Sequence, residues 1–380
     1  MNSNYRLSYE NRMNSGTLLL LSSPKKMNFG IDLSEWTIGE KFLGIKLIPL
    51  GVHFITFSLE NEKYNQKQFF FILVTKEKLN IIKKFSEEYQ FFISLSEEDE
   101  KNFSIGLNNF DFEENLGEYP IEQKENWNDL TKFISINVIN KLKPISKKFL
   151  TLEKEYENKN EKNDIKDNIY YSEIPKKIFN MGKIKGKELS EINIDKTKIL
   201  ENIIEKEYNN NFNDFLGEFQ YSFITFLLGE SYEGLIQWKD IFCLITNCEN
   251  AFLKYEKFFC NFVEVIYNQF RNFPNDLFYD EIIGNNFMKR YLNNFISNIN
   301  NFKGNEIINL KKRVNLFQKF LFEKFKYKIE NDEERIINNY LKGITSYSYN
   351  EEIDDDLPVV IDEKEIKKSE ERINKMNIDS

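Results

Sequence analysis

The chain has 380 residues, more than a single hydrophobic core usually serves, so two domains with connecting segments are expected. Its 52 basic and 61 acidic residues give a formal net charge of −9, which opposes non-specific attraction to phosphate backbones and argues against nucleic acid as the primary ligand. Three cysteines cannot form a disulfide framework, and no apolar run approaches the roughly 18 residues of a membrane-spanning helix, so we expect a soluble protein from a reducing compartment.

The first 150 residues have the pattern of a β-rich domain. Residues 1–14 are polar and are expected to be disordered. Beyond them, short apolar segments alternate with clusters of Gly, Pro or Asn, which is typical of strands and turns. These segments are residues 17–21, 45–48, 52–57, 69–74 and 81–85. We therefore expect a domain of sandwich or barrel type over residues 15–150.

Pro49-Leu50-Gly51 lies between two of these apolar segments. Glycine supplies the positive φ that a tight turn requires, and proline favours the start of such a turn. The sequence therefore predicts a β-hairpin at this point.

Helical patterns follow the strands. Ser96, with acidic residues after it, is typical of a helix start, and a second helix is predicted over residues 126–141. Residues 152–169 are highly charged and have almost no apolar spacing, so they cannot bury enough surface to offset the entropy of ordering. We expect a linker over residues 151–170.

The second half, residues 171–330, is strongly helical. Apolar residues recur at helical spacing in a series of segments separated by short loops. The segments are residues 199–204, 215–227, 232–245, 251–270, 274–284, 287–299 and 307–325. Pro274 suits an early helical position, and the segment it opens ends at Gly284. This pattern predicts an all-α domain, and hence an α+β fold class for the chain.

Residues 331–380 form an acidic tail that contains one β-prone stretch. Leu357, Pro358, Val359, Val360 and Ile361 lie between acidic clusters, and no strand neighbours them in sequence. An extended apolar segment of this kind suits β-augmentation, in which it adds a strand to a partner's sheet edge. Proline is compatible with pairing at an edge. The alternative is that these residues fold back onto their own domain.

No residue pattern predicts catalysis, a cofactor or a metal. The single histidine, His53, lies inside an apolar alternation without a nucleophile nearby, so a structural role is expected. Cys243, Cys248 and Cys260 match neither a CxxC pair nor a zinc arrangement and are typical of small core residues. Carboxylates are plentiful everywhere, so pairs of them carry no information about hydrolysis.

Two long blocks resemble one protein family. The sequence SGTLLLLSSPKKMNFGIDLSEWTIGEKFLGIKLIPLGVHF, residues 15–54, closely resembles the opening of the AAR-two family of U5 snRNP assembly factors (the cistron-splicing factors). The sequence LGEFQYSFITFLLGESYEGLIQWKDIFCLI, residues 216–245, resembles a helix pair of the same family's second domain. The blocks keep the family's order along the chain.

The resemblance implies a non-enzymatic protein with a β-rich domain and a VHS-like helical domain, located in the cytoplasm and the nucleus. It implies binding to the Prp-eight scaffold protein, through its RNase H-like and MPN-type domains, and exclusion of the helicase and of RNA during U5 snRNP assembly. In the family, the tail adds a strand between those two domains, so Leu357, Val359, Val360 and Ile361 are the expected partner-binding residues.

Two other functions compete with this one. A VHS-like helical domain by itself also suits a peptide-binding trafficking or adaptor protein, although the β-rich first domain argues against that reading. A hydrolase with unrecognised carboxylates would require a deep polar pocket.

Overall fold

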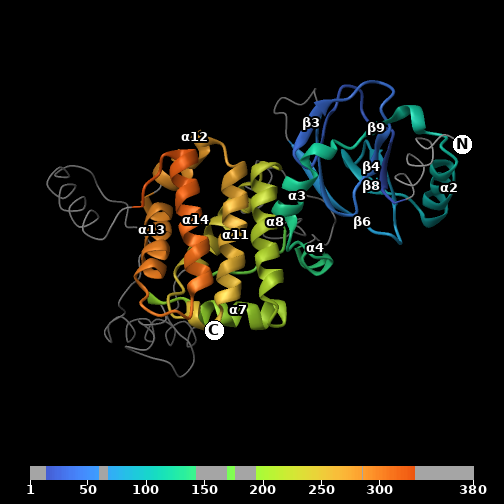
Figure 1. Cartoon of the computed structure of the whole chain (residues 1–380). Coiled ribbons are helices and arrows are strands. Elements are labelled where there is room, and N and C mark those ends of the chain that lie inside the picture. The colour runs from blue at the N-terminus through green and yellow to red at the C-terminus, as the bar shows by residue number, and fades with distance from the viewer. Residues whose placement is uncertain (1–13, 60–66, 143–168, 176–193, 285, 330–380) are drawn as a thin grey trace, which may run out of the picture. The chain divides into compact units, whose positions relative to one another are not determined.

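The computed structural model describes residues 14–59, 67–142, 169–175, 194–284 and 286–329 (Figure 1). The chain divides into two compact units, of which the first is Met1–Tyr171 with Gly217–Gln237 and the second is Ser172–Leu216 with Trp238–Ser380. The described strands belong to the first unit, and the second is helical. The α+β fold class is therefore confirmed, whereas the expected domain bounds stay a prediction.

The first unit contains two sheets. One sheet has the strand order β8-β7-β1-β4-β9 and mixes parallel with antiparallel pairs, because β1 runs parallel to β7 and antiparallel to β4. Its strands are β1 (Gly16–Leu21), β4 (Gly44–Ile48), β7 (Asn80–Ser86), β8 (Phe91–Ser94) and β9 (Leu116–Glu118). The other sheet is antiparallel, in the order β3-β2-β5-β6. Its strands are β2 (Asn28–Ile31), β3 (Ser34–Thr37), β5 (Gly51–Ser58) and β6 (Gln68–Val74).

The two sheets form a sandwich with helices on both outer faces. The sheets share one apolar core, and α2 (Glu97–Asn108) covers the outer face of the β1 sheet. Helices α3 (Lys124–Thr131), α4 (Ile136–Leu142) and the described first-unit part of α8 (Phe212–Leu227) cover the outer face of the β5 sheet (Figure 1). Successive side chains of a strand point to opposite faces, so Phe54 packs on the helices and Ile55 packs in the sandwich core.

The predicted hairpin at Pro49-Leu50-Gly51 is wrong. Ile48 pairs with Gly16 in one sheet, whereas Val52 pairs with Leu73 in the other. Gly51 has the expected positive φ, 136°, but the turn carries the chain from sheet to sheet. Strand β5 has β2 on one side and β6 on the other, which leaves no free edge with which β4 could pair.

Two predicted helices are interrupted. The helix predicted over residues 126–141 ends at Thr131 and resumes at Ile136, because the Phe133 amide donates to Gln220 Oε1 of α8 instead of continuing the helix. The helix predicted over residues 251–270 divides into α10 (Ala251–Lys254) and α11 (Glu256–Asn272). By contrast, the predicted start of α2 is confirmed, since Ser96 Oγ accepts from the Asp99 amide at 3.2 Å.

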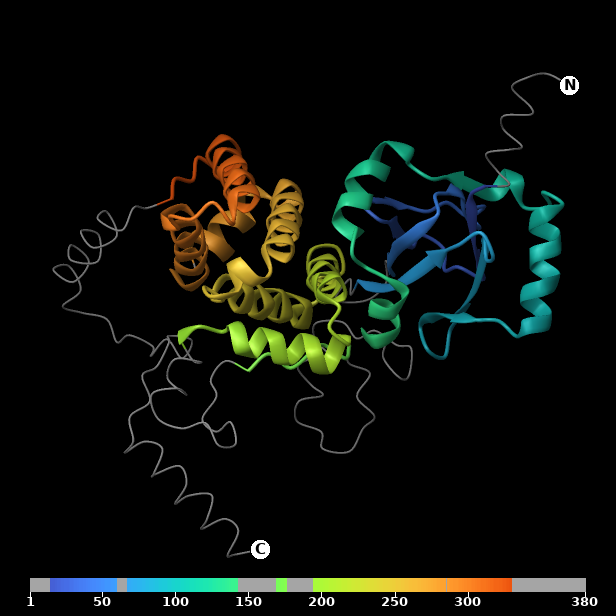
Figure 2. The ribbon, with the colours of Figure 1, turned by 60° about the horizontal axis from the view of Figure 1, so that its bottom comes forward.

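The second unit is a helical bundle (Figure 2). Many of its buried side chains are aromatic. Its helices are α7 (Thr197–Tyr208), the end of α9 (Tyr232–Thr246), α10, α11, α12 (Asn275–Phe278), α13 (Asn286–Asn301) and α14 (Ile308–Phe325), with the first turn of α8. Pro274 precedes α12, and a π-helical segment ends at Gly284, as predicted. No helix in the described part combines the length and hydropathy of a membrane-spanning segment.

Helices α11 and α14 are joined by hydrogen bonds at both ends of α14. Near its start, Glu256 Oε1 of α11 accepts from the Asn309 amide at 3.1 Å. Near its end, Lys324 Nζ donates to three carbonyl oxygens at the C-terminal end of α11, those of Phe270, Arg271 and Phe273, at 2.6–2.9 Å. A cation at a helix C-terminus opposes the partial negative charge of the last carbonyls. These contacts fix the rotation of α14 about its axis.

Candidate functional site

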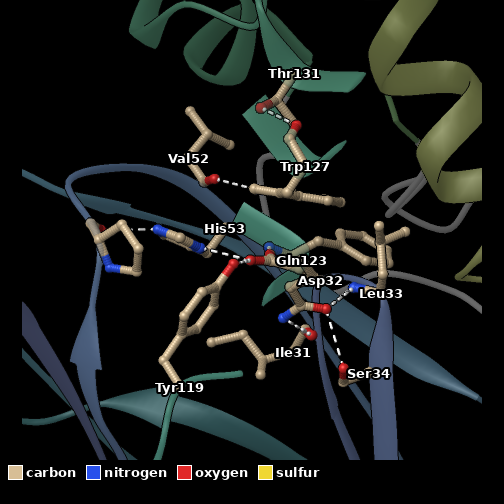
Figure 3. Close-up of polar contacts among 12 residues, drawn as sticks. Ile31, Asp32, Leu33, Ser34, Val52, His53, Tyr119, Gln123, Trp127 and Thr131 are labelled. Atoms are coloured by element: carbon tan, nitrogen blue, oxygen red, sulfur yellow. Dashed lines mark hydrogen bonds and ion pairs between the residues drawn. The ribbon is translucent and has the colours of Figure 1, made fainter. Parts of the chain in front are cut away.

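A buried group of polar side chains lies where β2 ends (Figure 3). Asp32 follows β2 in the left-handed region, with a φ of 55°. Its carboxylate accepts hydrogen bonds from the Phe54 amide at 2.9 Å and from the Tyr119 hydroxyl at 2.7 Å, and it lies 2.7 Å from His53 Nδ1. Burial and the Asp32 charge raise the pKa of Tyr119 well above its ordinary value, so the hydroxyl remains a donor.

Both ring nitrogens of His53 lie within hydrogen-bond distance of a polar group. Its Nε2 lies 2.9 Å from the carbonyl oxygen of Pro49, and a carbonyl can only accept, so Nε2 carries a hydrogen. Its Nδ1 lies 2.7 Å from the Asp32 carboxylate, so both ring nitrogens have a polar partner. The side chain is 2% exposed. His53 thus ties the turn before β5 to the end of β2, in agreement with the structural role expected from the sequence.

Two further side chains attach α3 and the turn before it to the same region. Gln123 Oε1 accepts from the Leu33 amide at 3.1 Å and from Ser34 Oγ at 3.0 Å. The indole nitrogen of Trp127 donates to the Val52 carbonyl at 2.7 Å (Figure 3). The group therefore joins β2, β5, β9 and α3, and its buried partners suit it to holding the fold rather than to reacting with a substrate.

Helix α8 is held against the sandwich by polar contacts as well as by packing. The fully buried Gln220 side chain accepts from the Phe133 amide at 2.7 Å and donates to the Asp129 carbonyl at 3.1 Å. Tyr221 stacks on Phe71 of β6 with ring centroids 4.4 Å apart. A side chain at Gly217 would place its Cβ 2.3 Å from the Phe133 carbonyl oxygen, so only glycine allows this approach.

Glu218 is a buried carboxylate on the same helix. It accepts a hydrogen bond from Gln237 Nε2 at 2.7 Å and forms an ion pair with Lys141 Nζ at 3.3 Å. A carboxylate removed from water requires such partners, and removing one of them leaves an uncompensated charge. The contact therefore favours one arrangement of α4, α8 and α9 within the first unit.

The cysteines have the surroundings of core residues. Cys248 and Cys260 are buried, and Cys243 is half-buried with its thiol 3.6 Å from Met288 Sδ. Burial raises the pKa of the Cys248 and Cys260 thiols, which disfavours the nucleophilic thiolate. Over the described ranges, no three His, Cys, Asp or Glu side chains gather as metal ligands would.

A pocket of about 460 Å³ lies beside the ends of β1 and β8 and the start of α2. Its lining consists of four apolar residues, one lysine, one carboxylate and two serines. The lining residues are Leu21, Ser22, Lys84, Ile93, Ser94, Leu95, Asp99 and Phe103. Asp99 accepts a hydrogen bond from Ser96 Oγ at 2.8 Å, which ties this carboxylate to the start of α2.

The partner-binding residues predicted from the sequence, Leu357, Val359, Val360 and Ile361, lie outside the described residues. The linker predicted over residues 151–170 also lies almost entirely outside them. The tail strand therefore stays a prediction.

Comparison with known proteins gives a consistent family assignment. Residues 14–144 match the model "AAR2 N-terminal domain", and residues 171–330 match "AAR2 C-terminal repeat region". The chain is 27% identical over 347 residues to "Protein AAR2 homolog" of Homo sapiens, which covers 82% of this chain and 89% of that protein. It is 28% identical over 352 residues to the Caenorhabditis elegans protein of the same name, covering 84% and 96%. The chain belongs to the AAR2 family.

Proposed function

We propose that this chain is a splicing-related assembly factor that binds the Prp-eight scaffold protein during U5 snRNP biogenesis. Membership of the AAR2 family supports a splicing-related function, and it is the observation that carries the proposal. The match extends over both units rather than over one domain, which favours a conserved role for the whole chain over that of an isolated helical adaptor module.

The chain acts by binding rather than by catalysis in this proposal. In support, His53 is buried with both nitrogens engaged, so it is a poor candidate for a general base. Burial raises the pKa of the Cys248 and Cys260 thiols, so these residues are poor candidates for a catalytic nucleophile. The partners proposed are the RNase H-like and MPN-type domains of Prp-eight, and no cofactor is required.

The tail supplies one part of the contact. Residues 357–361 add a strand between the two scaffold domains, so that main-chain hydrogen bonds provide affinity and alternate side chains provide specificity. Because the tail is ordered in the complex, part of the interaction energy is used in ordering it, which keeps the complex reversible. The bound factor keeps the helicase and RNA from Prp-eight until release, and it works in the cytoplasm before the particle functions in the nucleus.

The test is co-purification with the RNase H-like and MPN-type domains of the same organism's Prp-eight. Three versions are compared: the full chain, a chain ending at residue 356 and a chain ending at residue 363. The last version removes the charged end but retains residues 357–361, so it controls for shortening the tail.

We expect the full chain and the version ending at 363 to bind with similar affinity, and the version ending at 356 to bind at least about tenfold more weakly, since it lacks the added strand. If all three versions bind with equal affinity, residues 357–361 do not contribute to the contact with Prp-eight. If the full chain binds neither domain, the Prp-eight proposal is wrong.

A further inference from the structure

Helix α14 presents an apolar stripe to solvent. Its buried side packs into the second unit through Leu310, Val314, Phe317, Leu321 and Phe325. On the opposite side, Ile308, Leu316 and Phe322 are 48%, 66% and 54% exposed. Burying a large apolar side chain stabilises a protein by roughly 1.5–3 kcal/mol relative to exposing it, so three on one face are a feature that needs a reason.

The same stripe carries two lysines and one glutamate, Glu323, which follows Phe322. At 3.6 residues per turn, Lys312 and Lys319 fall between the three exposed apolar residues on one face of the helix. Helix α14 has five basic residues and one acidic residue. In the part of the chain that the structure describes, no carboxylate lies within ion-pair distance of Lys312 or Lys319, whereas Arg313 is paired with Glu264 at 2.9 Å. We call residues 308, 312, 316, 319 and 322 the α14 face.

A segment of the tail has the complementary pattern. Residues 351–363, EEIDDDLPVVIDE, have seven acidic and no basic residues, and these surround a run of apolar side chains. The acidic side chains of this peptide complement the lysines of the α14 face, and its apolar side chains complement the exposed apolar side chains of that face. Residues 87–100, EEYQFFISLSEEDE, also have an apolar run between acidic flanks, but that run forms β8, which pairs with β7 in the first unit.

The segment is close enough along the chain to reach the α14 face. About 20 residues connect it to the last described residue, and such a length spans up to roughly 70 Å when extended. Helix α14, with 18 residues, is about 27 Å long. A tether of this length produces a local concentration on the order of millimolar, so a weak contact is sufficient for occupancy.

We propose that residues 351–363 bind the α14 face of their own chain. The acidic side chains face Lys312 and Lys319, and the apolar run covers Ile308, Leu316 and Phe322. The regulatory consequence rests on the proposed function, because the same apolar run adds the strand to Prp-eight. Residues 357–361 cannot occupy both sites at once, so the α14 face competes with the scaffold for the tail. The same contact limits the pairing of residues 357–361 with sheet edges of other proteins.

Photo-crosslinking in the full chain tests this contact without Prp-eight. Phe322 is replaced by p-benzoylphenylalanine, the protein is irradiated in dilute solution, and crosslinked peptides are identified by mass spectrometry. A mixture of ¹⁴N- and ¹⁵N-labelled chains separates crosslinks within a chain from those between copies. The charge variant is Lys312→Glu with Lys319→Glu, and the matched control is Lys206→Glu with Lys303→Glu, two exposed lysines of the second unit outside the α14 face.

We expect crosslinks within the chain to residues 351–363, a fall in their yield of about fivefold in the charge variant, and little change in the control. Crosslinks to other segments, crosslinks between copies, or a yield that the charge reversal leaves unchanged would overturn the proposal. The scaffold domains are added last and should lower the yield. If they fail to bind while the crosslink persists, the Prp-eight proposal is wrong and the α14 contact stands.

Discussion

Replacing Tyr119 by phenylalanine should loosen the first unit. The change removes one donor from the Asp32 carboxylate and keeps the aromatic ring in place. A hydrogen bond to a charged group contributes about 1.5–3 kcal/mol, and Asp32 retains its contacts with Phe54 and His53. We therefore expect the local free energy of opening to fall by about 1.5–3 kcal/mol, which corresponds to roughly ten- to 150-fold faster amide exchange.

Hydrogen exchange followed by mass spectrometry measures this effect strand by strand. Peptides that cover β2 and β5 should exchange faster in Tyr119→Phe, whereas peptides of the second unit should not change. Tyr170→Phe is the matched control, because that side chain is 44% exposed and a surface change is expected to stay within about 0.5 kcal/mol. If β2 and β5 exchange as in the parent protein, Tyr119 does not support Asp32 in the way argued from the geometry.

The remaining predictions concern close packing, a helix end and alkaline pH. Gly217→Ala should destabilise the first unit by about 1–3 kcal/mol in urea unfolding because of the clash with Phe133, whereas Gly39→Ala, with no atom within 4 Å, should be neutral. Lys324→Met should lower the free energy of unfolding by about 1–2 kcal/mol, since three carbonyls lose a charged donor; unchanged urea unfolding would contradict this. Burial raises the pKa of Tyr221, so stability present below pH 10 should be lost as pH rises and the unfolded phenol ionises. Tyr221→Phe should remove about 1.4 kcal/mol of that loss per pH unit above 10 in thermal melts.

Local patterns were sufficient for much of the fold. The five short apolar segments predicted β1, β4, β5, β6 and β7 but missed the shorter strands β2, β3, β8 and β9. Ser96 predicted the start of α2. These predictions succeeded because strand alternation and helix capping depend on neighbours in sequence. The errors occur where the deciding partner is distant. The helix break at Phe133 depends on Gln220, which lies 87 residues later, and the strand pairing after Gly51 depends on β2 and β6.

The polar group around Asp32 shows the same limit. The apolar alternation predicts that His53 is buried, but it contains no signal for a carboxylate 21 residues earlier or for a hydroxyl brought in by β9. The tail strand is a different case, because its four predicted residues lie outside the described ranges and only a partner assay can test them.

The division of the chain into units has a consequence for synthesis on the ribosome. Strand β1 pairs with β7, whose residues are made about 60 positions later, and the first unit also takes Gly217–Gln237 from the middle of the helical half. The sandwich therefore lacks a complete covering layer until residue 237 has left the exit tunnel. Until then, α3 and α4 cover the outer face of β5 and β6 without α8, and Phe71 lacks the Tyr221 ring on which it stacks. Nascent chains therefore need protection from premature association over that interval.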